Sequence, residues 1–234
     1  LLAARVSIAD THRDGFIENI TTGRDVHDYD NFTLRTQLLF TPASALSIRL
    51  IGDYSKQEQQ CCINLPVGVF TSYENGAAIA NNFTQRAARL GYTPLPYDPF
   101  ARRTDANSNF QANMNAGGLS GQIDYDFGGA TLTWITAWRE WNWFPANDSD
   151  YTRLSVNLQN QQQNFQRQFS QEVRLGSNGS RTIDWVIGGY YFWQVINGYG
   201  TSAYGPDAPR WLFPNDPTAV SDAAAQTWSH WASR

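Results

Sequence analysis

The chain has 234 residues, a net charge of −4 and a single lysine, with no basic block that would suit a nucleic-acid partner. Hydrophobic residues make up 41% of the sequence and aromatic residues 14%, yet no apolar run reaches the roughly 18 residues of a membrane-spanning helix. A helical membrane protein is therefore excluded. A membrane β-barrel is not, because its strands are only half apolar.

Strict alternation of apolar and polar residues, the pattern of strands with one apolar face, recurs along the chain. It predicts about seven strands, at residues 3–16, 31–40, 46–55, 119–127, 131–141, 165–175 and 182–193. The cleanest is "LSGQIDYDF", in which Leu119, Ile123 and Tyr125 alternate with polar residues. The chain starts without Met and stops inside an aromatic pattern, "WSHWASR", so we expect it to be an interior piece of a longer protein.

The connections between these strands alternate between short and long. Turn residues fill the short ones, at "TPASA", "GG" and "GSNGS". The long ones comprise about ten residues near "TTGRDVHDYD", nearly sixty over residues 57–117 and about twenty over 147–164. In an up-and-down antiparallel sheet, this alternation places every turn at one end and every long loop at the other.

Two fold classes fit this pattern: a soluble β-sandwich and an up-and-down transmembrane β-barrel. Sandwich strands are usually shorter, and nothing gathers their long loops at one end. Charged residues also fall opposite the apolar positions, as a barrel lumen allows. Aromatic girdles would account for the rings near strand ends, which are Phe40, Tyr54, Tyr125, Phe127, Trp134, Trp141, Trp143, Tyr191 and Trp193. We therefore predict an all-β, antiparallel transmembrane barrel fragment with long extracellular loops.

Three segments resemble the barrel region of TonB-dependent outer-membrane receptors. They are "DNFTLRTQLLFTPASALSIRLIGDYSKQEQQCC" (30–62), "GQIDYDFGGATLTWITAWREW" (121–141) and "FSQEVRLGSNGSRTIDWVIGGYYF" (169–192). The resemblance implies that residues 1–234 are part of a 22-stranded barrel in the bacterial outer membrane, surrounded by lipid. It also implies a plug domain and a TonB-contacting region, both N-terminal to this chain.

Import of a scarce small ligand is the function that the resemblance implies. The ligand would be a ferric siderophore, cobalamin, haem or a sugar, and a TonB complex would energise its uptake. A passive porin-like channel and a soluble carbohydrate-binding sandwich are the alternatives. We also expect that a piece of about seven strands, with two unpaired edges, does not form a functional pore alone.

Nothing in the sequence predicts an enzyme. His12, His27 and His230 are isolated, without metal-ligand spacing, and no nucleophile elbow, phosphate loop or dinucleotide fingerprint occurs. Asp124 and Asp126 share one strand face, but acids that face a lumen explain them at least as well as acid–base catalysis. We expect no cofactor and no metal.

The long loop, 57–117, holds the first candidate ligand contacts. Within 77–90, Ile79, Phe83, Ala87 and Leu90 have helical spacing and are expected to pack the loop onto its neighbours. After them, "GYTPLPYDPF" sets Tyr92, Tyr97 and Phe100 between prolines, as rings on a stiff segment that suit either packing or a ligand.

A second set of candidates lies in "WREWNWFPANDSDY". Trp138, Trp141, Trp143 and Phe144 cluster where a strand leaves the membrane, and an interfacial girdle explains them better than ligand contact. Arg139, on the predicted lumen side, suits an anionic ligand or a plug carboxylate.

Both cysteines of the chain, Cys61 and Cys62, are adjacent at the root of the long loop. Export through the periplasm favours oxidation, and neighbouring Cα atoms lie closer together than in an ordinary disulfide. We predict a vicinal disulfide that turns the loop base. A free pair, or bonds to cysteines elsewhere in a longer chain, are the alternatives.

Overall fold

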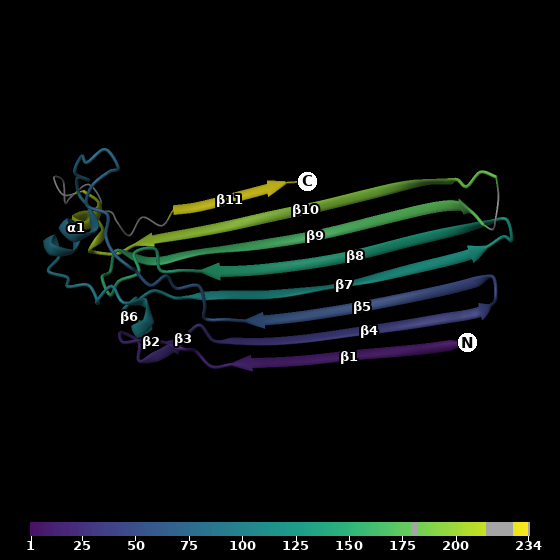
Figure 1. Cartoon of the computed structure of the whole chain (residues 1–234), viewed down its shortest axis with the longest axis horizontal. Helices are drawn as coiled ribbons and strands as arrows, with labels where there is room; N and C mark the ends of the chain where they lie inside the picture. Colours follow the sequence, from purple (N-terminus) through teal and green to yellow (C-terminus); the bar gives the residue numbers. More distant parts are fainter. Residues whose placement is uncertain (179–181, 214–226, 234) are drawn as a thin grey trace.

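An eight-stranded antiparallel sheet dominates the molecule (Figure 1). The computed structural model describes residues 1–178, 182–213 and 227–233. Each strand pairs with the next one along the sheet, in the order β1 (Leu2–Arg13), β4 (Tyr29–Ala43), β5 (Leu46–Glu58), β7 (Gln111–Asp126), β8 (Ala130–Ala146), β9 (Asn157–Ser177), β10 (Val186–Tyr204) and β11 (Thr227–Ser233). The predicted up-and-down antiparallel arrangement is thus confirmed.

The alternation pattern underestimated the extent of the sheet at three strands. It missed β11, the shortest strand of the sheet, and it began β9 at residue 165 instead of Asn157. The missed part of β9, "NLQNQQQN", is almost entirely polar and has no apolar alternation, yet its backbone pairs with β10 as far as Tyr204. Likewise β7 begins at Gln111, so the loop expected over 57–117 occupies residues 59–110.

The two faces of the sheet differ in polarity, and the register shows which residues share a face. One row of directly paired residues contains Thr36, Gly52, Leu119, Trp138, Phe169 and Trp193. The adjacent row contains Arg35, Asp53, Gly118, Arg139, Gln168 and Gln194. Successive residues of a strand point to opposite faces, so these rows define an apolar face and a polar face.

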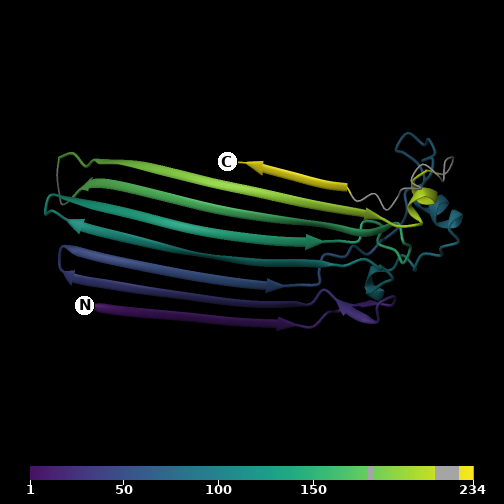
Figure 2. The same ribbon diagram turned by 180° about the vertical axis from the view of Figure 1, so that it is seen from behind.

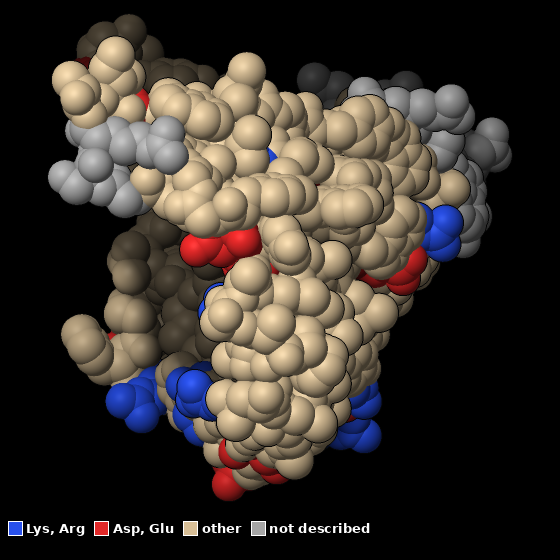
Figure 3. All heavy atoms as spheres, turned by 90° about the vertical axis from the view of Figure 1, so that its right-hand side faces the viewer, with Lys and Arg blue, Asp and Glu red and all other residues tan. Residues whose placement is uncertain are grey.

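Large side chains on the apolar face are exposed. Ile8, Leu119 and Ile187 are 67%, 70% and 68% accessible. In the described part of the chain, the eight-stranded sheet is accompanied only by a three-stranded one at the loop end, and no second sheet packs on this face. A β-sandwich buries one face of each sheet, so this arrangement is that of a barrel wall. The wall is open, and in end view it is curved and hollowed on one side, where basic and acidic side chains are visible (Figure 3).

In the described part of the chain, the long connections lie at one end of the sheet and the short turns at the other, as the sequence predicts (Figures 1 and 2). The loop end carries a small sheet and short helices: β2 (Ile17–Asn19), β3 (Arg24–Val26), β6 (Arg103–Thr104), α1 (Phe83–Arg89), η1 (Pro99–Ala101) and α2 (Ala208–Leu212). No helix in the described residues is long and apolar enough to cross a membrane.

The buried hydrophobic clusters of the described side chains belong to this loop layer. One gathers Ile17, Val26, Ile63, Ala106 and Phe110. The other gathers Val156, Ala208 and Trp211, against which Phe83 and Leu90 pack. The predicted apolar stripe over 77–90 therefore packs the long loop onto its neighbours, the β8–β9 and β10–β11 connections, as expected. Its helix is shorter than expected, because Asn82 caps the helix with its side chain and α1 begins only at Phe83.

Candidate ligand-binding site

Arg139 lies on the polar face of β8, as predicted, and it has a partner two strands away. Its two guanidinium NH₂ groups donate to the two carboxylate oxygens of Asp53, on β5, at 3.0 and 2.9 Å. Gly118, on β7, lies between them in the row and has no side chain to block the contact. This bidentate geometry fixes the guanidinium in place.

A hollow of about 390 Å³ surrounds this ion pair on the polar face. The polar residues that line it are Ser7, Thr33, Arg35, Asp53, Ser55 and Arg139. Two arginines face a single carboxylate here, and Arg35 lies directly across from Asp53. The hollow is thus locally basic and suits an anionic group.

Trp141 and Trp143 follow Arg139 on the same face of β8. Their rings stack with centroids 5.9 Å apart, and both side chains are half-buried. Because they share the polar face with Arg139, the girdle interpretation is wrong for these two residues. The girdle expectation fits Trp134 and Trp138 better, because they lie on the apolar face, where Trp138 stacks on Trp193 at 6.0 Å.

The loop layer contains a second cavity, of about 640 Å³. Its lining includes Tyr92 and Tyr97, two of the predicted contacts, along with other rings and both signs of charge: Phe70, Tyr73, Phe83, Tyr151, Arg86, Arg103, Asp105 and Asp150. Within this lining, however, several of the charged groups are already engaged by protein atoms.

Tyr92 illustrates this internal pairing. It is 7% exposed, and its hydroxyl donates to both oxygens of Asp105, at 3.0 and 3.2 Å. Burial and the neighbouring Asp105 carboxylate raise the pKa of Tyr92 well above its usual range. Burial also raises the pKa of Asp105. Tyr92 therefore stabilises the loop, and little of its ring is available to a ligand.

Tyr97 and Phe100 lie differently. Tyr97 is 40% exposed and lines the loop cavity, whereas Phe100 is 90% exposed in η1 and lines none of the cavities described above. The six predicted contact residues therefore fall into three groups: Arg139, Trp141 and Trp143 on the polar face, Tyr92 and Tyr97 at the loop cavity, and Phe100 on the outer surface.

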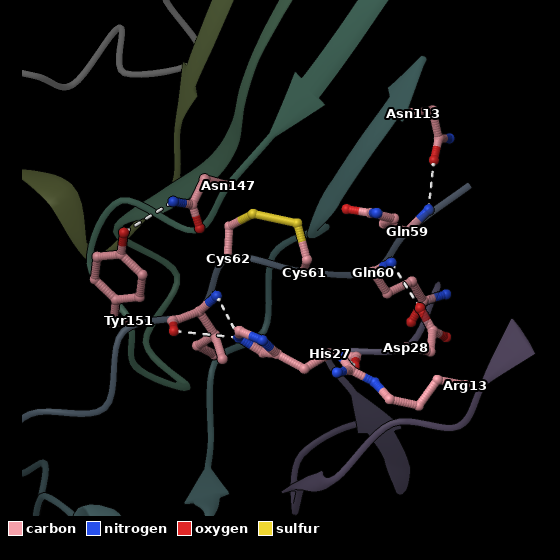
Figure 4. The surroundings of a disulfide bond; sticks show 11 residues. Arg13, His27, Asp28, Gln59, Gln60, Cys61, Cys62, Asn113, Asn147 and Tyr151 are labelled. Carbon is pink, nitrogen blue, oxygen red and sulfur yellow. Dashed lines mark hydrogen bonds between the residues drawn. A yellow bond between two sulfur atoms is a disulfide. The ribbon is translucent and has the colours of Figure 1, made fainter. Parts of the chain in front are cut away.

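Cys61 and Cys62 form a vicinal disulfide at the root of the long loop, three residues after the end of β5 (Figure 4). Their Cα atoms are 3.7 Å apart. Cys62 has a φ of 77°, in the left-handed region that non-glycine residues rarely adopt. The chain therefore turns sharply here as it leaves the sheet.

Hydrogen bonds from three other segments hold this turn (Figure 4). Backbone N–H groups beside the disulfide donate to side chains as follows: Gln59 to Asn113, Gln60 to Asp28 and Ile63 to His27, at 3.1, 2.7 and 3.1 Å. Beyond it, the Asn64 and Asn147 amides both donate to the Tyr151 hydroxyl, at 2.9 and 2.8 Å. The loop root is thus fixed to β7, to the segment after β3 and to the β8–β9 connection.

Sequence reasoning missed the two aspartates that organise the β8–β9 connection. Asp148 is fully buried, and its carboxylate accepts four backbone N–H groups, those of Asn107, Ser108, Asp150 and Tyr151. Asp150 accepts from Thr152 and Asn157, but burial raises its pKa to about 6. The "NDSD" run is the signal that was available, because Asp and Asn bind nearby backbone groups in turns.

The acidic pair near the turn end, Asp124 and Asp126, is also held by protein atoms. Asp124 accepts from Gln122 and Thr133, each at 2.8 Å, and Asp126 accepts from the Gly128 N–H and the Asn178 amide, each at 2.7 Å. Among the described side chains, no group of three or more His, Cys, Asp and Glu could hold a metal ion.

The polar face suits ligand binding. There the stacked rings of Trp141 and Trp143 follow Arg139 along β8, beside the basic hollow that Arg139 lines.

Comparisons with known proteins bear on the fold. No family model and no curated protein matches the chain. Among solved structures, it is similar to the ferric yersiniabactin uptake receptor FyuA from Yersinia pestis, with a TM-score of 0.58 and 16% sequence identity. The similarity covers 87% of this chain but only 27% of that receptor. At this identity it shows a related fold and nothing finer.

Proposed function

We propose that the protein is part of a TonB-dependent receptor of the bacterial outer membrane that imports a scarce small ligand, with a ferric siderophore as the first candidate. In this proposal residues 1–234 form part of the barrel wall and residues 59–110 are an extracellular loop. The apolar face contacts lipid. The plug and the TonB-contacting region belong to a more N-terminal part of the protein.

The observation that carries the proposal is the stacked pair of Trp141 and Trp143 on the polar face, next to the Arg35–Asp53–Arg139 row and on its loop side. In a membrane wall these rings contribute nothing to the lipid interface. At the loop end they would meet a solute that enters from outside. Aromatic faces together with guanidinium groups suit a ligand with flat rings and negative charge. The fold it shares with a ferric yersiniabactin uptake receptor supports the siderophore class.

The test is ligand uptake by a deletion strain that carries the complete gene, grown under iron starvation with defined ferric siderophores. The variant Trp141→Ala/Trp143→Ala should lower ligand affinity about tenfold, because each stacking contact contributes about 0.5–1.5 kcal/mol. Trp134→Ala, on the same strand but on the apolar face, is the matched control and should leave affinity unchanged.

Three outcomes would contradict the proposal. Uptake that persists without a TonB complex would indicate a passive channel. Recovery of the complete protein as a soluble monomer without detergent would refute the membrane location. Equal affinity of the double variant and the Trp134→Ala control would remove the aromatic stack from the ligand site.

A further inference from the structure

The disulfide between Cys61 and Cys62 lies between the sheet and the loop cavity. β5 ends three residues before it, and the residues that follow it, 64–66 and 68–70, line part of the cavity. Cys62 is exposed and Cys61 is half-buried, so a small molecule in the solvent can reach the bond. The path of the chain from the sheet into the cavity wall is therefore set at this bond.

His27 contacts the chain on both sides of the disulfide (Figure 4). Its backbone N–H donates to the carbonyl oxygen of Gln60 at 2.6 Å, and its Nε2 accepts the N–H of Ile63 at 3.1 Å. Arg13 in turn donates to the carbonyl oxygen of His27 at 2.8 Å. Both contacts with His27 require the present separation of Gln60 and Ile63, and the two cysteines between them set that separation.

The backbone conformation of Cys62 depends on the bond. Its φ of 77° lies in the left-handed region, which is unfavourable for a residue other than glycine. The disulfide closes a ring around the peptide bond that joins the two cysteines, and this ring restricts the backbone torsions of both. Once the bond is open, Cys62 is free to return to a negative φ, and the direction of the chain from Ile63 onward then changes.

A change at Ile63 reaches the cavity wall. The side chain of Ile63 is 6% exposed and packs in the buried cluster that includes Val26 and Phe110. The next residue, Asn64, donates from its amide to the hydroxyl of Tyr151, another residue of the cavity lining. Loss of the contact between Ile63 and His27 would therefore remove the support of this part of the wall.

We propose that the Cys61–Cys62 disulfide is a redox-sensitive clasp that small thiols outside the cell open by reduction. One thiolate attacks the sulfur of Cys62, the S–S bond breaks, and Cys61 leaves as a thiolate that takes up a proton. A second thiolate attacks the sulfur of the first thiol, which forms the small-molecule disulfide and releases Cys62 as a thiolate that is protonated in turn. Two small thiols are thereby oxidised, both cysteines are reduced, and the loop root and the cavity wall are released.

Hydrogen exchange of the complete protein in detergent, with reduced or oxidised glutathione, tests the clasp. Reduction should speed exchange of the Ile63 and His27 amides about tenfold, because the left-handed conformation is disfavoured by about this factor. Chymotrypsin should also cut within residues 64–70 sooner in the reduced protein. The Ala112 amide, which donates to the Gln59 carbonyl oxygen at 3.0 Å on the sheet side, is the internal control and should not change.

Two double variants separate the bond from the backbone. Cys61→Ser/Cys62→Ser should exchange like the reduced protein in both buffers. Cys61→Ser/Cys62→Gly should exchange like the oxidised protein in both, because glycine adopts a left-handed φ without steric cost. Heat-modifiable mobility on gels verifies folding, and the wild-type comparison still decides if a variant fails to fold.

Three results would overturn the clasp. One is equal exchange of the wild type in the two buffers, once maleimide labelling has confirmed reduction. Another is equal exchange of the two double variants. The third concerns access: on intact cells, reduced glutathione should make both cysteines reactive toward a membrane-impermeant maleimide, and a lack of labelling would exclude small thiols as the reductant.

The clasp goes beyond ligand import. It relies on the extracellular position of residues 59–110 in the proposed function, but not on the identity of the imported ligand. A protein whose loop root responds to glutathione but that imports no ligand contradicts only the proposed function. A protein that imports its ligand and keeps its loop root unchanged on reduction contradicts only the clasp.

Discussion

Replacing Gly118 with alanine should destabilise the sheet and separate Arg139 from Asp53. A Cβ at this position would lie 2.6 Å from the carbonyl oxygen of Trp138 and 2.9 Å from Cγ of Arg139. The arginine side chain can move away. The carbonyl belongs to the backbone of the neighbouring strand, so relief there requires a shift of β8 against β7.

The backbone contact should dominate the energetic effect. Overpacking of this kind costs about 1–3 kcal/mol. The ion pair contributes little more, about 0–1 kcal/mol, because the Arg139 side chain is 50% exposed and the pair is open to solvent. We therefore expect Gly118→Ala to lower the free energy of unfolding by about 2 kcal/mol.

Urea unfolding of the complete protein in detergent micelles, followed by tryptophan fluorescence, measures this change. Gly189→Ala is the control, because an added Cβ there meets nothing within 4 Å. Removing glycine from a strand interior should leave that variant as stable as the wild type or more stable by about 0.5–1 kcal/mol. Equal unfolding free energies for the two variants would refute the proposed contact with the Trp138 carbonyl.

Three further results are expected. In intact protein, neither cysteine should react with a maleimide until a dithiol is added, after which both should react; labelling without a reductant would contradict the vicinal disulfide. Tyr92→Phe should destabilise the loop layer by about 1–3 kcal/mol, because it removes the hydroxyl that donates to the buried Asp105 carboxylate. Tyr97→Phe is the control and should have little effect. Hydrogen exchange across residues 92–105 compares the stability of the loop layer in the two variants. Because burial raises the pKa of Asp150 to about 6, the folded state holds its proton after the unfolded state has lost it. Loop stability should therefore fall as pH rises from about 4 to about 6, and Asp150→Asn should abolish this dependence of the protection factors.

The strands could be read from the sequence because their alternation is a local property. Residues 119–127 show it most clearly, and they lie in β7. The faces of β8 were harder to assign. In "TLTWITAWREWNWF" bulky apolar residues occupy both sets of alternate positions, so aromatic character alone suggested a girdle for Trp141 and Trp143. Alternation along β8 places both on the face of Arg139, and the register with β7 and β9 shows that this is the polar face of the sheet.

The loop layer depended on contacts that no local pattern contains. Tyr92 was read as a ring for a ligand, but its partner Asp105 lies thirteen residues away, in a segment without a sequence signal of its own. The ion pair of Arg139 and Asp53 was equally hidden. The two residues are 86 positions apart in the sequence and come together only when β5 and β8 pair on either side of β7.

The position of the long loop has a consequence for the order in which the sheet forms. β5 and β7 are adjacent in the sheet although about fifty residues separate them, whereas the three-residue turn at 127–129 joins β7 to β8. The entropy of closing the longer connection is less favourable by about 2.5 kcal/mol. We therefore expect the β4–β5 and β7–β8 hairpins to form first and to join later. The seam between them, where the ion pair of Asp53 and Arg139 bridges Gly118, would then close last in this part of the sheet.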